Sequence, residues 1–184
     1  MIELVRETTE TKVRLKLALA NGAAEPGQIR TNDRFLDHML QCLARYSGLN
    51  LAIDATGDLR HHLVEDVAIT LGLALRDAIP ETCARYGHAV VPMDDALVEA
   101  ALDAGGRAFY AGRLPSRLYE HFFRSFAENS GLTLHVSVRR GRDRHHIIEA
   151  AVKATGFALG QALAEADTVF STKGAVRVER RETR

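Results

Sequence analysis

Two copies of one short motif hold the side chains of this sequence that are best suited to metal chemistry. Each copy has two adjacent histidines and then a glutamate, and the copies run from His61 to Glu65 and from His145 to Glu149. Residues i and i+4 share a face of a helix, so the first histidine of each copy can converge with its glutamate. Adjacent helical residues project about 100° apart. We therefore expect the two histidines of a pair to serve different metal ions.

One more histidine precedes each copy, and each follows an acidic residue: His38 follows Asp37, and His121 follows Glu120. The candidate metal ligands are therefore six histidines and two glutamates: His38, His61, His62, Glu65, His121, His145, His146 and Glu149. This set is large enough for two metal ions with four protein ligands each. Imidazole and carboxylate without thiolate suit Mn, Fe, Co or Zn, and open coordination positions are typical of catalytic sites.

The motif lies within an internal repeat. Residues 61–78 recur at 145–162 with seven of 18 positions identical, and residues 35–53 recur at 118–136. A single pair of adjacent histidines is more often a helix terminus or a partly buried site with satisfied hydrogen bonds. Duplication explains the similarity of the two segments. The retention of all four paired histidines and both glutamates indicates a role for them.

Each repeat predicts the order strand, strand, helix, strand, helix. Apolar alternation predicts strands near 13–19, 49–53 and 132–138. The first predicted helix covers 34–46, with Asp33 as its N-cap and Gly48 at its end. Three more helices are predicted: one over 62–78, one that begins at Ser116 or Arg117, and one over 146–165.

These elements predict an α+β fold of two pseudo-equivalent half-domains, each a mixed sheet with two helices packed on one face. The expected boundaries are 1–88 for the first half-domain, 89–174 for the second and 175–184 for a C-terminal tail.

Composition narrows the function classes. The chain has 24 basic and 24 acidic side chains and a pI near 7.1, which gives no support for nucleic-acid or membrane-surface binding. Its apolar stretches are too short to span a membrane, and its first residues mix both charges, so we expect no signal peptide. Cys42 and Cys83 cannot form a disulfide framework, and we expect a cytoplasmic protein.

Four other features are weaker. The arginines between Arg139 and Arg144 could bind RNA, but we interpret this segment as a solvated hairpin tip, since no aromatic residues are interleaved with it. His88 is expected in a loop and His135 in a strand. Ser171 to Gly174 combine hydroxyls, an ammonium and a glycine, which together make a plausible phosphate cradle.

The order of these motifs resembles the imidazoleglycerol-phosphate dehydratase family over nearly the whole chain. The resemblance rests on RETTET, FLDHML, HHLVEDVAI, ARYG, PMDDAL, EHFF, RHHIIEAAVKA and STKG. It implies a hydro-lyase of histidine biosynthesis that converts imidazole glycerol phosphate to imidazole acetol phosphate and water. It also implies two Mn²⁺ ions per active site and homo-oligomers, trimers combined into a 24-subunit particle, with active sites between subunits.

The resemblance also implies roles for individual residues. One metal would be held by His38, His61, Glu65 and His145, and the other by His62, His121, His146 and Glu149. The acid/base residue would be Glu10, and substrate contacts would be made by Arg85, Arg107, Lys153, Ser171 and Lys173.

The chain departs from the usual family pattern in places. Only Arg60 separates Leu59 from His61, the segment before His121 is shorter than usual, and Phe170 replaces a proline. A metal-storage protein of the same fold is the alternative of a different class. The phosphate-binding set argues against it, because storage needs no phosphate cradle.

Overall fold

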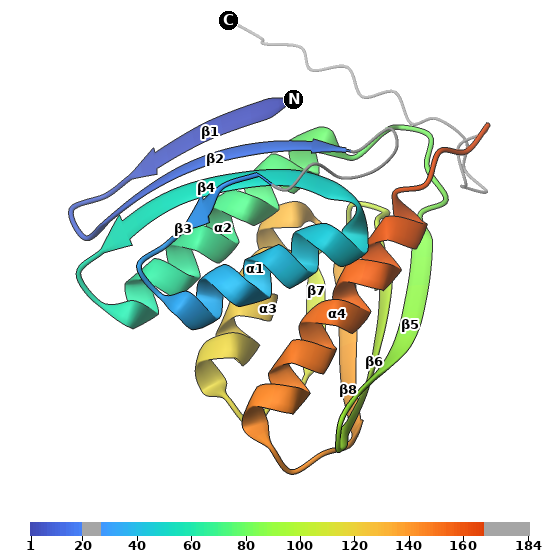
Figure 1. Ribbon diagram of the computed structural model, residues 1–184. Helices are drawn as coiled ribbons and strands as arrows, with labels where there is room; N and C mark the ends of the chain where they lie inside the picture. The colour runs from blue at the N-terminus through green and yellow to red at the C-terminus, as the bar shows by residue number, and fades with distance from the viewer. Residues whose placement is uncertain (20–26, 168–184) are drawn as a thin grey trace, which may run out of the picture.

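The computed structural model describes residues 1–19 and 27–167, which form two halves of matching topology (Figure 1). The first half contains β1 (Ile2–Glu7), β2 (Thr11–Leu19), β3 (Ile29–Arg30), α1 (Arg34–Ser47), β4 (Leu49–Gly57) and α2 (Arg60–Ala78). The second contains β5 (Tyr86–Met93), β6 (Ala96–Asp103), β7 (Phe109–Gly112), α3 (Arg117–Ser130), β8 (Thr133–Arg140) and α4 (Arg144–Ala162). No helix within the described ranges has the length and apolar character to cross a membrane.

Each half has one mixed four-stranded sheet. The strand orders are β1-β2-β4-β3 and β5-β6-β8-β7, and the last strand in each order pairs in parallel with its neighbour while the others are antiparallel. The expected α+β fold of two equivalent halves, each with two helices on one face of a mixed sheet, is confirmed.

The helices lie between the two sheets (Figure 1). Helices α1 and α2 pack on the first sheet, and α3 and α4 pack on the second. Across the middle, α1 packs against α4 and α2 packs against α3. Alternation in the strands supplies the apolar faces: Val13, Leu15 and Leu17 point inward and are at most 1% exposed.

The helix ends follow local signals in the sequence. Asp33 caps α1 as expected, because its carboxylate accepts hydrogen bonds from the N–H groups of Phe35 and Leu36 at 2.9 and 3.1 Å. Of the two residues considered at the start of α3, Ser116 is the N-cap. Gly48 and Gly131 end α1 and α3 with φ of 71° and 72°, a left-handed conformation that glycine adopts without penalty.

Some elements differ from the sequence-based expectation. Strands β3 and β7 were not anticipated, because runs of two and four residues carry no clear periodicity. Helix α4 ends at Ala162 rather than 165. The residues after it pair with the segment before β5, where Ala84 N–H donates to Ala164 O at 2.8 Å.

Two residue placements are corrected. His88 lies in strand β5 and not in a loop, and its N–H donates to Gln161 Oε1 at 3.0 Å. The arginine-rich segment is not a hairpin tip: it runs from the end of β8 into the start of α4, and Arg139 forms an ion pair with Glu99.

Two glycines set how closely the helices of the two halves approach each other. A Cβ added to Gly72 in α2 would lie 2.8 Å from Phe126 O in α3, and a Cβ added to Gly156 in α4 would lie 2.8 Å from Tyr46 Cβ in α1. These glycines occupy equivalent positions of the repeat. Their conservation between the copies therefore has a packing reason, and it allows the paired helices to lie in close contact.

We predict that Gly72→Ala and Gly156→Ala each destabilise the fold by about 1–3 kcal/mol, because the added methyl group overpacks the helix contact. Alanine has a higher helix propensity than glycine, so helix propensity alone would make these variants more stable. A loss of stability would therefore come from the steric clash. The midpoint of urea unfolding measures it. Arg76→Ala on the exposed face of α2 is the control and should change stability by less than about 0.5 kcal/mol. Glycine variants as stable as the wild type would contradict the prediction.

Candidate metal centre

The first group of candidate ligands forms where α1 meets α4. Glu149 Oε2 lies 3.3 Å from His38 Nε2 and 3.1 Å from His145 Nε2. The two imidazole rings are 6.4 Å apart between centroids and inclined by 23°. One carboxylate from the second half therefore lies between a histidine of its own half and a histidine of the other half.

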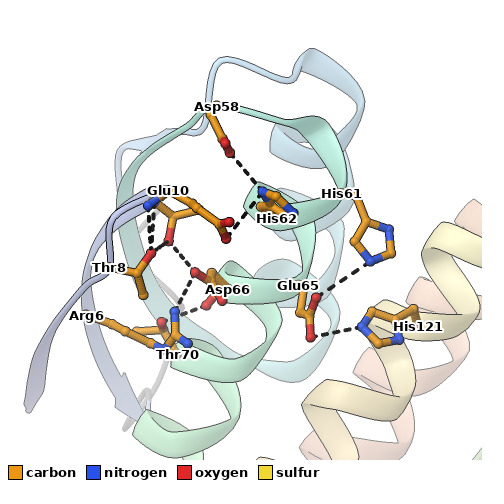
Figure 2. A network of polar contacts seen from close by, with 11 residues as sticks. Arg6, Thr8, Glu10, Asp58, His61, His62, Glu65, Asp66, Thr70 and His121 are labelled. Atoms are coloured by element: carbon orange, nitrogen blue, oxygen red, sulfur yellow. Dashed lines mark hydrogen bonds and ion pairs between the residues drawn. The ribbon is translucent and has the colours of Figure 1, made fainter.

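The second group repeats this arrangement where α2 meets α3, as Figure 2 shows. Glu65 Oε1 lies 3.2 Å from His121 Nε2, and Glu65 Oε2 lies 3.6 Å from His61 Nε2. The rings of His61 and His121 are again inclined by 23°. Both groups thus contain two histidines and one glutamate drawn from both halves of the chain.

The donor spacing fits a bound cation. Ligands at about 2.0–2.2 Å from one ion lie roughly 3–3.5 Å from each other. Three of the four carboxylate–imidazole separations, at 3.1, 3.2 and 3.3 Å, are in this range, and the fourth, between Glu65 Oε2 and His61 Nε2, is longer at 3.6 Å. His121 Nε2 supports the fit independently, since it is buried and makes no well-aligned hydrogen bond although Glu65 is close. A ring nitrogen and a carboxylate oxygen that face a common point without a proper hydrogen bond are arranged as two ligands of one metal would be.

Cys42 lies beside the first group. Its Sγ is 3.9 Å from the ring nitrogens of His38, and burial, together with the charge of Glu149, raises the pKa of this thiol. The thiol form is therefore favoured while no metal ion is bound, and the ligand atoms of His38, Cys42 and Glu149 lie within 4.8 Å of one another.

Lys153 sets the electrostatics of the first group. Burial opposes the charged form of Glu149, but the Lys153 ammonium, 2.7 Å away, and His38 outweigh it, and the pKa of this carboxyl lies below its ordinary value. The same contact raises the pKa of Lys153. The expected substrate-contacting lysine is therefore one turn of α4 from the expected metal ligand Glu149.

The second histidine of each pair points away from these groups. His62 Nδ1 lies 2.9 Å from Asp58 Oδ1 and 3.4 Å from Glu10 Oε2. His146 Nδ1 lies 2.8 Å from Asp95 Oδ1, and its Nε2 lies 3.3 Å from Asp94 Oδ2. The divergence expected for adjacent helical residues therefore separates each pair.

These carboxylates shift the titration of the outer histidines. The bond to Asp58 raises the pKa of His62, and the bond to Asp95 raises the pKa of His146. The pKa of Asp95 falls to about 2, because His146 and the N–H groups of Arg142 and Asp143 stabilise its charge.

The contacts within one chain pair the candidate ligands differently from the assignment that the resemblance implies, which takes the ligands of one site from different chains and stays a prediction. That assignment placed Glu149 with His121 and Glu65 with His38. In the structure, Glu149 lies with His38 and Glu65 lies with His121. The physical reason is the helix packing. Where α1 packs against α4, His38 lies opposite Glu149, and where α2 packs against α3, His121 lies opposite Glu65. The two contacts are equivalent because the chain contains an internal repeat.

The expected substrate residues lie in different places. Arg85 binds Asp103 through Nε at 2.7 Å and Nη2 at 3.0 Å, and Arg107 Nη2 lies 3.8 Å from the same carboxylate. The N–H of Arg85 donates to Ala162 O at the last turn of α4, about 24 Å along the helix from His146. Ser171 and Lys173 lie outside the described residues.

Several polar residues near the groups were not anticipated. Asp58 lies four residues before His62 and two before the start of α2, so the four-residue spacing could have identified it. Asp94, Asp95 and Asp66 come from a hairpin turn and a buried helix face, and only the tertiary contacts place them.

Comparison with known proteins identifies the family. A sequence model of the family described as imidazoleglycerol-phosphate dehydratase matches residues 31–159. The chain belongs to this family. The resemblance inferred from the motifs, and the hydro-lyase class that the family name denotes, are confirmed.

Individual members of the family match along most of their length. The imidazoleglycerol-phosphate dehydratase of Granulibacter bethesdensis is 44% identical over 93% of this chain and 96% of its own. That of Metallosphaera sedula is 43% identical over 95% of this chain and 98% of its own. The crystal structure from Pyrococcus furiosus has a TM-score of 0.83 and 40% identity, and covers 94% of this chain and 100% of that one. A Staphylococcus aureus structure has a TM-score of 0.77 and 31% identity over 90% of this chain and 100% of that one.

We predict that metal content separates the two possible groupings. If the structural groups each hold one ion, His38→Ala with Glu149→Gln removes one ion per chain, whereas His38→Ala with Glu65→Gln removes both. The sequence-based grouping requires the opposite pattern. Metal analysis and calorimetric titration of the single and double variants measure the stoichiometry.

Proposed function

We propose that the protein dehydrates imidazole glycerol phosphate to imidazole acetol phosphate in histidine biosynthesis, at a site with two divalent cations, with Mn²⁺ as the native ion. The observation that carries this proposal is the pair of equivalent groups of two histidines and one glutamate. Membership of the dehydratase family supports the reaction. Imidazole and carboxylate donors suit Mn²⁺ as well as Fe, Co or Zn, and the resemblance to the dehydratase family favours Mn²⁺.

His62 and His146 would complete the groups from a second copy of the chain. Each group has three donors from one chain, and each half leaves one histidine turned away from its own group. The carboxylates of Asp58 and Asp95 hold Nδ1 of these rings. Such a carboxylate partner orients an imidazole for metal binding through its other nitrogen. Four protein ligands per ion would follow, with positions left for substrate.

Glu10 would be the acid/base residue. Its Oε2 lies 3.4 Å from His62 Nδ1 and its side chain is about half exposed, so it would accompany His62 into a neighbouring copy's group. The cations would supply Lewis-acid stabilisation and orientation of the substrate imidazole. Glu10 would then remove the proton from the second carbon from the ring, which no carbonyl group acidifies, while the hydroxyl leaves as water from the carbon adjacent to the ring; the enol that results would tautomerise to the ketone.

The phosphate group would be bound by residues from more than one chain. Lys153 is close to the metal groups, but Arg85 and Arg107 lie at the far end of α4 from them. A single chain therefore does not place these arginines beside its own candidate metal ligands, and a second copy would supply them together with Ser171 and Lys173. Binding of the remote phosphate would hold the substrate in the reactive orientation.

We propose that the copies assemble as trimers combined into a 24-subunit particle in the cytoplasm. The outer face of the second sheet carries large apolar side chains, Tyr86, Val90 and Phe109, each about half exposed, and these would pack against other copies. Both cysteines are free and buried, which fits a reducing compartment.

We predict that chelation dissociates the larger particle and abolishes activity, because the metal ions join ligands from different copies. Light scattering before and after chelation, and after Mn²⁺ is restored, measures the change. A particle of unchanged size after complete metal removal would count against shared ligands. Retained metal binding without any dehydratase activity in the untreated protein would favour metal storage instead.

We predict that Glu10→Gln retains both metal ions but lowers kcat by about 10²–10⁴-fold, the usual contribution of a positioned acid or base. Glu7→Gln is the matched control, since Glu7 is an exposed glutamate of the same hairpin that pairs with Lys12 at 2.7 Å. It should have wild-type turnover. Turnover of Glu10→Gln close to that of the control would remove Glu10 from the mechanism.

A further inference from the structure

The turn between β1 and β2 carries Glu10, and threonine hydroxyls fix its shape (Figure 2). Thr8 Oγ1 accepts hydrogen bonds from the N–H groups of Glu10 at 3.1 Å and Thr11 at 3.0 Å. The hydroxyls of Thr8 and Thr11 are 3.1 Å apart. The backbone that presents Glu10 is therefore held from within the turn.

A buried carboxylate ties this turn to helix α2. Asp66 is 8% exposed, and its Oδ2 accepts a hydrogen bond from Thr11 Oγ1 and lies 2.5 Å from Arg6 Nη1. Arg6 is the last residue but one of β1 and Thr11 begins β2, so Asp66 holds both strands next to the turn. Burying a charge costs free energy unless the charge is paired and hydrogen-bonded. An apolar side chain would fill this position at a lower cost, so the carboxylate indicates a role beyond packing.

The second half provides an internal comparison without this anchor. Val13 pairs with Ala55 and Val98 pairs with Val138, which makes Glu10 the counterpart of Asp95 in the other hairpin turn. The counterpart of Asp66 in α4 is Ala150, a fully buried alanine.

The two turn carboxylates consequently differ in their contacts. Asp95 bonds His146 Nδ1 at 2.8 Å and accepts the N–H of Arg142 at 2.6 Å. Glu10 stays 3.4 Å from His62, whose Nδ1 is bound more closely by Asp58. In the second half, the turn carboxylate of Asp95 forms a hydrogen bond with His146. In the first half, the turn carboxylate of Glu10 lies near His62 but remains exposed to solvent.

We propose that Asp66 is a positioning residue that acts through Thr11 and Arg6 to hold the β1–β2 turn, so that the Glu10 carboxylate is presented to the substrate. Asp66 does not itself touch the reacting atoms. The inference rests on the proposed function, in which Glu10 transfers the proton.

Variants of Thr11 test this link with little change in size. Thr11→Val removes the hydroxyl that donates to Asp66, and Thr11→Ser retains it. We expect Thr11→Val to lower kcat by about 10²-fold, as a small misplacement of a catalytic group does, with KM and metal content close to wild type. Thr11→Ser should recover most of the turnover.

A double-mutant cycle distinguishes positioning from general damage. In the Glu10→Gln background, Thr11→Val should cause little further loss, because the group that it positions is already absent. The matched control is Thr70→Val, which removes a buried hydroxyl that donates to Asp66 O at 2.7 Å but does not reach the turn. It should lose comparable stability and keep its turnover.

Amide hydrogen exchange provides a readout that does not depend on activity. Thr11→Val should accelerate exchange in residues 8–11, and Thr70→Val should not. Wild-type exchange in that turn, undiminished kcat in Thr11→Val, or an equal loss in the Glu10→Gln background would each overturn the inference. If the wild type lacks dehydratase activity, the proposed function fails, and the exchange experiment alone decides whether Asp66 anchors the turn.

Discussion

The close packing of α1 against α4 and of α2 against α3 is the contact on which the candidate metal centre depends. In each pair, a histidine from one half reaches a glutamate and a histidine from the other half, so neither half contains a complete group. Gly72 and Gly156 leave room for the helices to approach closely. Because these helices also cover the inner faces of both sheets, the same layer supplies the core and positions the ligands.

Duplication gave the two halves equivalent ligand groups, and later divergence gave them different surroundings. The first helix position after each motif glutamate is Asp66 in one half and Ala150 in the other. In the first half Asp66 pairs with Arg6 beneath the hairpin turn, and Glu10 lies 3.4 Å from His62; in the second half Asp95 lies closer to the outer histidine, 2.8 Å from His146. The two equivalent groups of candidate ligands therefore have different carboxylates around them.

The arrangement of one chain explains why more than one copy would be needed. His62 and His146 turn away from their own groups, because adjacent helical residues diverge. Arg85 and Arg107 gather around Asp103 at the opposite end of α4 from the ligands. An active site between copies would bring the arginines of one chain close to the candidate metal ligands of another, although the length of α4 separates them within one chain.

The sequence by itself determined the duplicated α+β fold, the helix ends at Asp33 and Gly48, the family, and the candidate residue types for metal binding. These follow from local periodicity, capping and the repeated motif, which are visible along the chain. It did not determine the contacts that His38 and His121 make with the glutamates within one chain, nor the contacts of Asp66 and Asp95, nor the short strands β3 and β7. Those depend on contacts between segments far apart in the sequence, and only the tertiary packing of the helices and hairpin turns fixes which side chains meet.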